Sequence, residues 1–496
     1  MRVVVVGAGL GGLSAACHLA GGGHEVTVVE RTDGPGGRAG QWQSAGYSFD
    51  TGPSVLTMPD VVAATFRAAG ADVLDYVRLR PLDPCYRATF PGDGPLLMRQ
   101  GRAAMAAEIR DTCGAGEAAG FERFCDWLER LYRLEWPNFI DRNFDSPFDL
   151  VRPPWPSIRL AGSGGFRRMG RVVDSYFADE RLRKLFSFQS LYAGLSPFEA
   201  LAIFGVITYM DTVGGVWYPE GGLFSLASGL AAAAARAGAV FRYEQAVARI
   251  EQRSGTAGPV SGVRLAGGEL LTADAVVCNV EAAAAYRELL PGTAAPRVVR
   301  EGEYAPSCIL WLAGVRGRLP DATAHHNLHF GGDWRAAFDA LLRRGTRQSD
   351  PSMLVTVPTV SDSSLAPPGG HVLAALEPVP NLDGHVDWTD ERDRARTSLL
   401  TRLSDLGYPV GDVVTERFVD PLRWEALGLT KGTPFSLSHR FLQSGPWRTP
   451  NVDHRVPGLV LVGDSTVPGV GIPMVLTSGR LAAARVEHLG RQRMLR

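Results

Sequence analysis

The chain opens with a strand, a glycine-rich turn and a helix, and this opening constrains the fold more than any other feature. A short apolar run, Val3 to Val6, leads into the glycine-rich stretch Gly7 to Gly12 and then a helical stretch, Leu13 to Ala20. A second apolar run, Val26 to Val29, ends at Glu30. Apolar runs joined by a short helix are typical of buried parallel strands. The sequence therefore predicts an α/β fold that begins with a βαβ unit.

The glycines of this turn satisfy G-x-G-x-x-G, and each has a physical role. Gly7 allows the tight turn, Gly9 lets the backbone approach a pyrophosphate, and Gly12 lets helix and strand pack closely. The helix N-terminus stabilises the phosphate charge. Glu30 would accept hydrogen bonds from the ribose hydroxyls. We infer a Rossmann-type dinucleotide-binding domain, with FAD and NAD both open at this point.

Length and composition limit the remaining possibilities. A chain of 496 residues exceeds one hydrophobic core, so we expect two or three domains, at least one assembled from separated segments. With 45% hydrophobic and 21% charged residues, disorder and a polytopic membrane protein are both disfavoured. A net charge of -1 makes nucleic acid an improbable partner. No uninterrupted apolar run reaches eighteen residues, so membrane contact would be peripheral.

Patterns further along the chain place the other elements. Ala103 to Leu134 has helical periodicity, and Val172 to Tyr209 is mostly helical and unusually apolar. A first group of strand-like runs predicts a meander, or strands returning to the first sheet: Val247 to Ile250, Val260 to Leu265 and Ala275 to Val277. A second group predicts a separate antiparallel sheet: Ser307 to Val315, Ser352 to Val357 and His371 to Pro378. Six cysteines without a C-x-x-C pair suggest a reducing cytoplasm.

Two segments after Glu30 extend the cofactor motif. Gly36, Gly37 and Arg38 form a glycine doublet followed by a fork of donors that suits phosphate oxygens. This stretch resembles the extended fingerprint of the amine-oxidase and carotenoid-desaturase flavoproteins, which implies FAD as the cofactor. Phe49 to Ser54 resembles the segment beside the flavin's ribityl chain and ring, with Gly52 and Pro53 in contact. We also assign Val247 to the cofactor site.

The other end of the chain supplies a matching segment. Gly458 to Pro473 resembles the carboxy-terminal signature of bacterial phytoene desaturases. The resemblance implies that Gly463 and Asp464 approach the ribityl-phosphate region, and that Gly471, Ile472 and Pro473 line the isoalloxazine. The following helix would direct its positive N-terminus toward the flavin. Many relatives carry a small residue in place of Asp464 and a histidine or glutamine in place of Val467, which leaves the substrate open.

The resemblance runs in matching order through nearly the whole chain and suggests a division into domains. Residues 1–75, 215–285 and 452–496 would form a discontinuous FAD-binding domain. Residues 76–130 and 286–451 would form a substrate-binding domain of mixed sheet and helices. The helical, apolar residues 131–214 are a candidate membrane-contact region.

The same resemblance implies desaturation of a C40 polyene, phytoene first among them, by hydride transfer to flavin N5 with loss of a neighbouring proton. Expected partners are the polyene, the inner face of a membrane contacted peripherally from the cytoplasm, and oxygen or quinone as electron acceptor. Glu220 and Arg167 are the catalytic candidates. A polyene needs an apolar tunnel. Candidates for its lining are Phe186, Phe188, Phe204, Trp217 and Tyr218.

Several alternatives stay open. The fold also serves isomerases, ketolases, later-step carotenoid dehydrogenases and amine oxidases, and a non-catalytic FAD-binding protein is a third class. An amine oxidase is disfavoured because Lys431 does not fall in a matching motif. His325, His326 and His329 have spacing compatible with a metal site, but they lack the H-E-x-x-H glutamate. We predict an exposed turn there and no metal.

Overall fold

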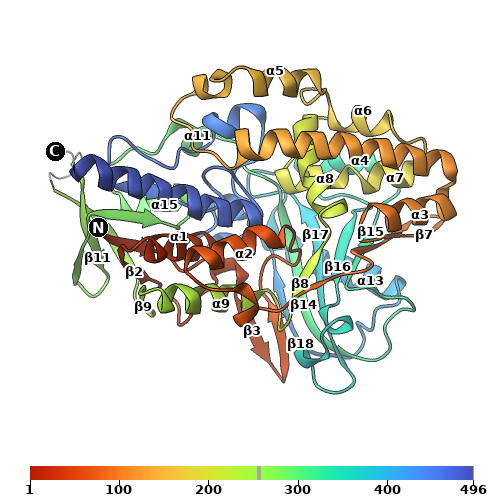
Figure 1. The fold of residues 1–496 in the computed structure, drawn as a ribbon. Coiled ribbons are helices and arrows are strands. Elements are labelled where there is room, and N and C mark those ends of the chain that lie inside the picture. Colours follow the sequence, from red (N-terminus) through yellow and green to blue (C-terminus); the bar gives the residue numbers. More distant parts are fainter. Residues whose placement is uncertain (254–257, 495–496) are drawn as a thin grey trace.

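The computed structural model describes residues 1–253 and 258–494, and its first layer is a five-stranded parallel sheet (Figure 1). The strand order is β19-β13-β1-β2-β9, and every neighbouring pair is parallel. Strands of valine and leucine buried on both faces form the centre of such sheets. The predicted α/β class with a Rossmann-type domain is therefore confirmed. The strands are β1 (Arg2–Val6), β2 (Glu25–Val29), β9 (Val240–Arg242), β13 (Ala275–Cys278) and β19 (Leu459–Leu461).

Helices from both ends of the chain cover one face of this sheet. The first helix, α1 (Leu10–Gly21), packs along the last one, α15 (Ile472–Met494), and the two lie side by side in Figure 1. A Cβ on Gly479 would lie 2.4 Å from the Ser14 side chain, so this crossing requires glycine. Helices α2 (Pro59–Ala68) and α9 (Leu223–Arg236) also pack on α1. The first and last segments of the chain thus form one body.

Each of the two arrangements predicted for the first group of strands is present in part. The antiparallel strands β10 (Val247–Gln252), β11 (Val260–Leu265) and β12 (Leu270–Thr272) form a three-stranded sheet. Residues 275–278, in contrast, return to the parallel sheet as β13. Strands of the parallel sheet come from each of the segments 1–75, 215–285 and 452–496. The domain limits themselves stay a prediction.

The second large layer is a seven-stranded sheet in the order β18-β14-β17-β16-β15-β6-β7. The three strands expected from sequence are present and antiparallel, as β14, β17 and β16. Helix α13 (Trp388–Asp405) packs against one face of this sheet. The strands are β6 (Tyr86–Phe90), β7 (Asp93–Met98), β14 (Ser307–Arg316), β15 (His326–His329), β16 (Met353–Thr356), β17 (Gly370–Val379) and β18 (Val413–Val419).

The histidine cluster is not the exposed turn that the sequence suggested. His326 and His329 lie on β15, and the side chains of His325, His326 and His329 are all buried. The ring Nδ1 of His329 is 2.7 Å from the Thr89 hydroxyl, and its Nε2 is 3.0 Å from the Tyr408 hydroxyl. Burial lowers the pKa of His325 to about 3 and that of His329 to about 4, so both rings are neutral core groups. Within residues 1–253 and 258–494, no group of three acidic, His or Cys side chains could hold a metal.

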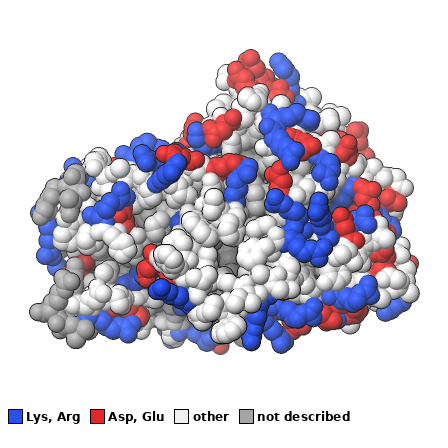
Figure 2. All heavy atoms as spheres, turned by 90° about the horizontal axis from the view of Figure 1, so that it is seen from above, with Lys and Arg blue, Asp and Glu red and all other residues white. Residues whose placement is uncertain are grey.

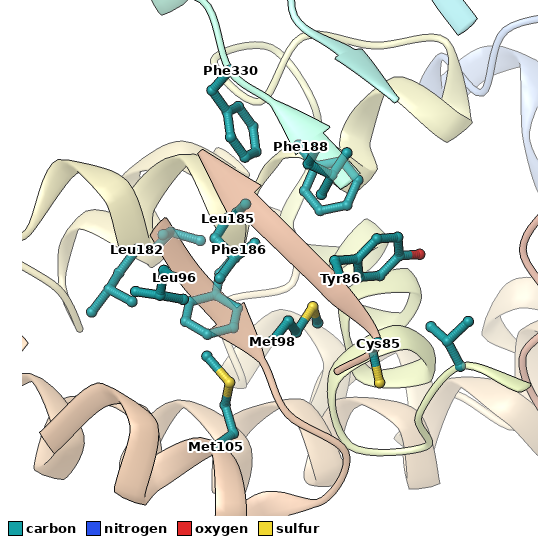
Figure 3. Close-up of a cluster of buried hydrophobic side chains, with 14 of the residues drawn as sticks. Cys85, Tyr86, Leu96, Met98, Met105, Leu182, Leu185, Phe186, Phe188 and Phe330 are labelled. Atoms are coloured by element: carbon teal, nitrogen blue, oxygen red, sulfur yellow. The ribbon is translucent and has the colours of Figure 1, made fainter. Parts of the chain in front are cut away.

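A helical layer covers the other side of the seven-stranded sheet. The helical stretch expected over 103–134 is two helices, α3 (Arg102–Cys113) and α4 (Ala115–Glu135), because Gly114 takes φ +100° between them. The apolar stretch 172–209 is also divided, into α6 (Met169–Asp174), α7 (Glu180–Leu185), the 3-10 turn η5 (Phe188–Ala193) and α8 (Gly205–Thr212). Figure 3 shows how Phe186 and Leu182 from this layer meet Leu96 and Met98 of β7.

The remaining segments are shorter. A hairpin of β3 (Gln41–Ser44) and β4 (Tyr47–Asp50) and the pair β5 (Leu79–Pro81) with β8 (Trp217–Pro219) link the two large sheets. Three further helices, α5 (Trp155–Gly162), α11 (Arg297–Glu301) and α14 (Pro421–Ala426), lie outside the sheets. Helices α10 (Ala282–Ala284) and α12 (Trp334–Phe338) each continue directly into a π turn. None of the described helices is long and apolar enough to cross a membrane.

Candidate active site

One cavity of about 1460 Å³ runs from the glycine-rich turn after β1 to the helical layer over the second sheet. It exceeds the usual size of a small-molecule site, about 300–1,000 Å³, and is large enough for a dinucleotide together with a second ligand. All cofactor-site residues expected from sequence except Gly12 line it. They are Gly7, Gly9, Glu30, Gly36, Gly37, Arg38, Gly52, Pro53, Val247, Gly463, Asp464, Gly471, Ile472 and Pro473. Their contacts with a cofactor stay a prediction.

The first turn has the geometry that a diphosphate requires. Gly7 takes φ +95°, and a Cβ on Gly12 would lie 2.1 Å from the Gly7 carbonyl oxygen, so neither position accepts a side chain. Gly9 is the N-cap of α1, and no side chain caps that helix. The first N–H groups of α1 are therefore available to an anionic ligand, as at other phosphate-binding helix N-termini.

Glu30 is buried at the end of β2 and braces the same turn. Its Oε2 accepts a hydrogen bond from the Ala8 N–H at 2.8 Å, and its Oε1 accepts from the Thr32 N–H at 3.0 Å. The carboxylate thus joins β2 to the turn after β1. It also lines the cavity, where a ribose would meet it, and that contact stays a prediction.

Asn279 is a cavity residue that the motif analysis missed. A Cβ on Gly9 or on Gly11 would lie 2.7 Å from the amide of Asn279, and one on Gly463 would lie 3.0 Å from it. Asn279 follows β13 and therefore contacts the first turn and the carboxy-terminal loop at once. A lone asparagine at the end of a strand is too common in sequences to be singled out, whereas three glycines around one side chain are recognisable in the structure.

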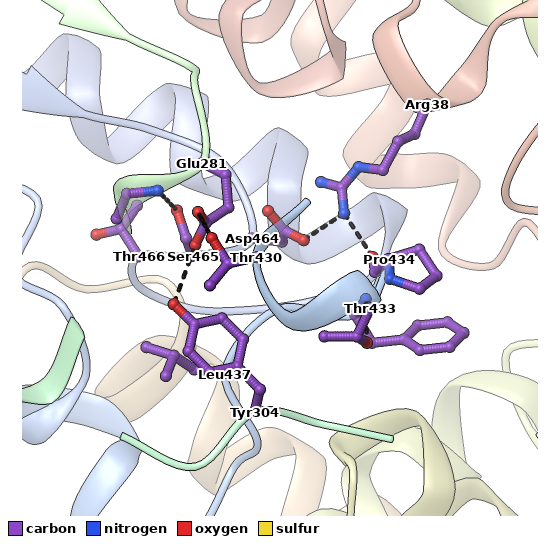
Figure 4. A network of polar contacts seen from close by, with 12 residues as sticks. Arg38, Glu281, Tyr304, Thr430, Thr433, Pro434, Leu437, Asp464, Ser465 and Thr466 are labelled. Atoms are coloured by element: carbon purple, nitrogen blue, oxygen red, sulfur yellow. Dashed lines mark hydrogen bonds and ion pairs between the residues drawn. The ribbon is translucent and has the colours of Figure 1, made fainter. Parts of the chain in front are cut away.

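Arg38 and Asp464 connect the two ends of the chain across the cavity. Arg38 donates from Nη1 to Oδ2 of Asp464 at 2.6 Å and to the Pro434 carbonyl at 2.5 Å, as Figure 4 shows. The Asp464 side chain is only 6% exposed, so the pair is partly buried and less screened than a surface pair. The acidic residue of the carboxy-terminal loop therefore holds the arginine of the glycine doublet.

Arg448 stabilises the carboxy-terminal loop, and the motif analysis missed this residue as well. Its guanidinium is buried and donates to the carbonyls of Asp464 at 2.6 Å, Thr466 at 3.0 Å and Leu437 at 3.2 Å. Burial lowers its pKa to about 10. Because five N–H donors fit several carbonyls at once, one arginine can fix a loop without a carboxylate.

The apolar end of the cavity is built by the helical layer and the second sheet. Of the five aromatic residues proposed to line it, Phe188 and Phe204 do so, whereas Phe186, Trp217 and Tyr218 do not. Phe186 is fully buried in the core beside Phe121 and Phe177. The apolar wall has further members on separated elements: Leu191, Ile203, Ile207, Met210, Leu310, Leu328, Phe330, Leu354 and Leu376.

Besides Glu30 and Asp464, two further buried carboxyl groups line the cavity, and the motif analysis missed both. Asp211 of α8 is 2% exposed, and burial raises its pKa to about 7. Glu135 ends α4, is 4% exposed, and burial raises its pKa well above its usual range. A buried Asp or Glu without a motif around it resembles any other acidic residue in a sequence.

Neither catalytic candidate from the sequence lies in this cavity. Glu220 follows β8 and forms ion pairs with Arg80 and, at 3.9 Å, with Arg78. Arg167 is exposed at the surface. Neither is among the residues that line the cavity, so neither is placed to contact a ligand there.

Known proteins are similar to this chain in sequence and in fold. The family model of flavin containing amine oxidoreductases matches residues 10–487. A phytoene dehydrogenase of Streptomyces griseus is 46% identical over 98% of this chain and 95% of its own length. A zeta-carotene-forming phytoene desaturase of Myxococcus xanthus is 37% identical over 98% and 93%. A solved oxidoreductase of Methanosarcina mazei, 18% identical, shares the fold with a TM-score of 0.60 over 98% of this chain and 100% of that one.

Proposed function

Since this chain belongs to the flavin containing amine oxidoreductases, and within them to the phytoene desaturase type, we propose that it desaturates phytoene or a similar C40 polyene in carotenoid biosynthesis. Members of this family are FAD-dependent oxidoreductases, and so is this chain. The alternatives of amine oxidation, ketolation and isomerisation use the same cofactor fold. They differ in what the second half of the cavity must hold.

The observation that carries the proposal is the continuity of the cavity. A polar end built from glycine backbone and Arg38 opens directly into an end walled by leucine, isoleucine and phenylalanine side chains. A hydrocarbon offers no polar handle, so its position must come from the shape of an apolar site. An amine substrate would instead need polar or aromatic partners for its nitrogen, such as a cage of ring faces.

The chain's own residues would bind and orient both ligands. The uncapped N-terminus of α1 and the Arg38 side chain suit the diphosphate, and Gly471 to Pro473 suit the ring. When bound, the flavin supplies an acceptor at N5 for two electrons and a proton as hydride. The apolar wall would hold an allylic carbon against that acceptor and exclude water. Oxygen or a quinone would then take the electrons.

We further propose that the protein contacts a membrane through an apolar rim at the cavity mouth. The apolar rim consists of Phe148, Val151, Trp155, Ile158, Phe166, Phe441 and Leu442, all at least 42% exposed. Phe166 and Phe441 touch, with ring centroids 6.0 Å apart, and both also line the cavity. Uncharged surface with basic side chains beside it occupies the face that carries α5 (Figure 2). Such a surface suits a bilayer that stores the substrate.

Anaerobic half-reactions test the proposed activity. FAD-loaded protein is mixed with phytoene in liposomes, and flavin bleaching is followed together with the visible absorption of the lengthened polyene. We expect both signals to rise together. Absence of bleaching with every C40 polyene would refute the desaturase proposal, and bleaching by amines alone would favour an amine oxidase.

Liposome flotation tests the apolar rim. The double variant Trp155→Asp with Leu442→Asp is expected to lose most liposome binding while keeping bound flavin. The reason is that placing two charged side chains in contact with lipid is energetically unfavourable. Leu74→Asp is the matched control, since Leu74 is 75% exposed but lies outside the apolar rim. Equal flotation of the double variant and the control would exclude this surface as the membrane contact.

A further inference from the structure

Asp211 is a buried carboxyl group on the cavity wall whose position no structural need explains. It lies in the last turn of α8 and is 2% exposed. Its Oδ2 has no hydrogen-bond partner among the residues that the structure describes. Burying an unsatisfied charged group is expensive, so such a group usually has a functional reason.

The groups that face Asp211 come from three elements and none is a cation. Cys85 and Tyr86 face it from the start of β6, and Tyr192 and Gln189 face it from η5. Thr208 lies one turn earlier on α8 and donates to Gln189 Oε1 at 3.4 Å. Figure 3 shows Tyr86 with its hydroxyl directed away from the apolar cluster. Burial raises the pKa of Asp211 to about 7, while Gln189 and Tyr86 act against that rise.

The other buried carboxyl groups that line the cavity are either hydrogen-bonded to the protein or lack polar neighbours. Glu30 accepts two backbone N–H groups, and Asp464 pairs with Arg38. Glu135 also has an Oε1 without a hydrogen-bond partner among the described residues, and burial raises its pKa well above its usual range. Among these carboxyls, Asp211 alone combines a free oxygen, a place on the wall and neighbours that support its ionised form.

The chain connects Asp211 closely to the segment expected beside the flavin ring. Five residues after Asp211 the chain reaches Val216, whose carbonyl accepts from the Leu82 N–H at 2.9 Å. The next residue, Trp217, donates its N–H to the Leu56 carbonyl at 2.8 Å. Leu56 follows Gly52 and Pro53, which line the cavity. The segment that follows α8 is therefore hydrogen-bonded to the chain just after Gly52 and Pro53.

We propose that Asp211 is the proton acceptor of the desaturation, an inference that rests on the proposed function. One allylic C–H bond breaks and its hydrogen leaves with both electrons to the oxidised flavin. The neighbouring C–H bond breaks, its electron pair becomes the new C=C bond, and its proton goes to the Asp211 carboxylate. The base must return its proton to solvent before the next turnover, for which the neighbouring tyrosine hydroxyls offer a path.

The test uses the full-length, FAD-loaded protein in phytoene-containing liposomes. Asp211→Asn is expected to slow single-turnover flavin bleaching about 100-fold or more, the range for loss of a general base. KM for phytoene and the bound-flavin spectrum should change little. In the wild type the bleaching rate should rise with pH through about 7, because only the ionised carboxyl accepts a proton. Asp211→Glu should restore part of the rate and of the pH dependence.

Two further variants keep the result interpretable. Thr212→Val removes a neighbouring buried hydroxyl that also has no hydrogen-bond partner among the described residues. This variant should bleach at close to the wild-type rate. Glu135→Gln tests the rival carboxyl and should keep the wild-type pH profile. An unchanged bleaching rate and pH profile in Asp211→Asn would overturn this inference alone. A slower bleaching rate in Glu135→Gln instead of in Asp211→Asn would do the same. Wild-type protein that bleaches with no C40 polyene overturns the proposed function as well.

Discussion

The two ends of the cavity are built in different ways, and the difference decides what a sequence can reveal. The cofactor end is made largely of backbone, because glycines at 7, 9, 11, 36, 37, 463 and 471 line it without side chains. The apolar end is made of side chains on helices and strands far apart in sequence. A backbone site tolerates almost no substitution, whereas a wall of many weak contacts tolerates single changes. Mutations at the two ends should therefore differ in kind.

Gly12→Val should have the largest effect. Its Cβ would lie 2.1 Å from the Gly7 carbonyl oxygen, so the turn cannot keep its shape and the protein should retain no flavin after desalting. Flavin absorbance per protein measures this. Gly116→Ala is the control, because a Cβ there meets nothing within 4 Å. Flavin retained by Gly12→Val would mean that the backbone end tolerates substitution, contrary to the comparison.

Arg38→Ala should have the second largest effect. It removes the proposed phosphate donor and leaves the Asp464 carboxylate without its partner. The FAD dissociation constant should therefore rise about 10- to 100-fold, equal to roughly 1.5–3 kcal/mol. Flavin fluorescence titration measures the change. Arg318→Ala removes an exposed pair with Asp321 and should not alter FAD affinity. Equal affinities of Arg38→Ala and wild type would remove Arg38 from the cofactor site.

At the apolar end, Ile207→Trp should affect the substrate and not the cofactor. The larger side chain narrows the cavity, and KM for phytoene should rise about 10-fold while bound flavin is unchanged. Steady-state kinetics and the flavin spectrum separate these effects. Val414→Trp, on the exposed part of β18, serves as the control. A loss of flavin in Ile207→Trp would show that the two ends are not independent.

The smallest expected effect concerns stability and pH. The pKa of Glu135 is raised by folding, so its contribution to stability is present below its unfolded pKa and is lost as pH rises toward its folded pKa. The Glu135→Gln variant has no carboxyl group at this position, so it does not lose this stability as the pH rises. From pH 5 to pH 8 the Tm of the variant should therefore gain about 2 to 4 °C on the wild type. Parallel Tm curves would show that Glu135 is ionised in the folded protein.

The sequence predicted most residues that line the cofactor end of the cavity and few that line the apolar end, for the same reason. Glycines required by positive φ or by close approach leave a spacing such as 7, 9 and 12 that can be recognised without a structure. Asn279 and Arg448 act through tertiary contacts with loops elsewhere in the chain, and no local pattern marks them. Asp211 and Glu135 matter because they are buried, and burial is set by elements distant in sequence. The histidine cluster was misplaced because a short strand in a buried sheet has no alternation to reveal it.

The parallel sheet also sets an order of events during synthesis. Its strands β1 and β2 are synthesised well before the edge strand β19 and the loop with Asp464, which come much later in the chain. Until they emerge, β13 has an unpaired edge and α1 lacks its longest helical neighbour, α15. Flavin insertion should therefore follow the synthesis of residues 459–473, and chains that end near residue 458 should bind chaperones instead of being weakly active enzymes.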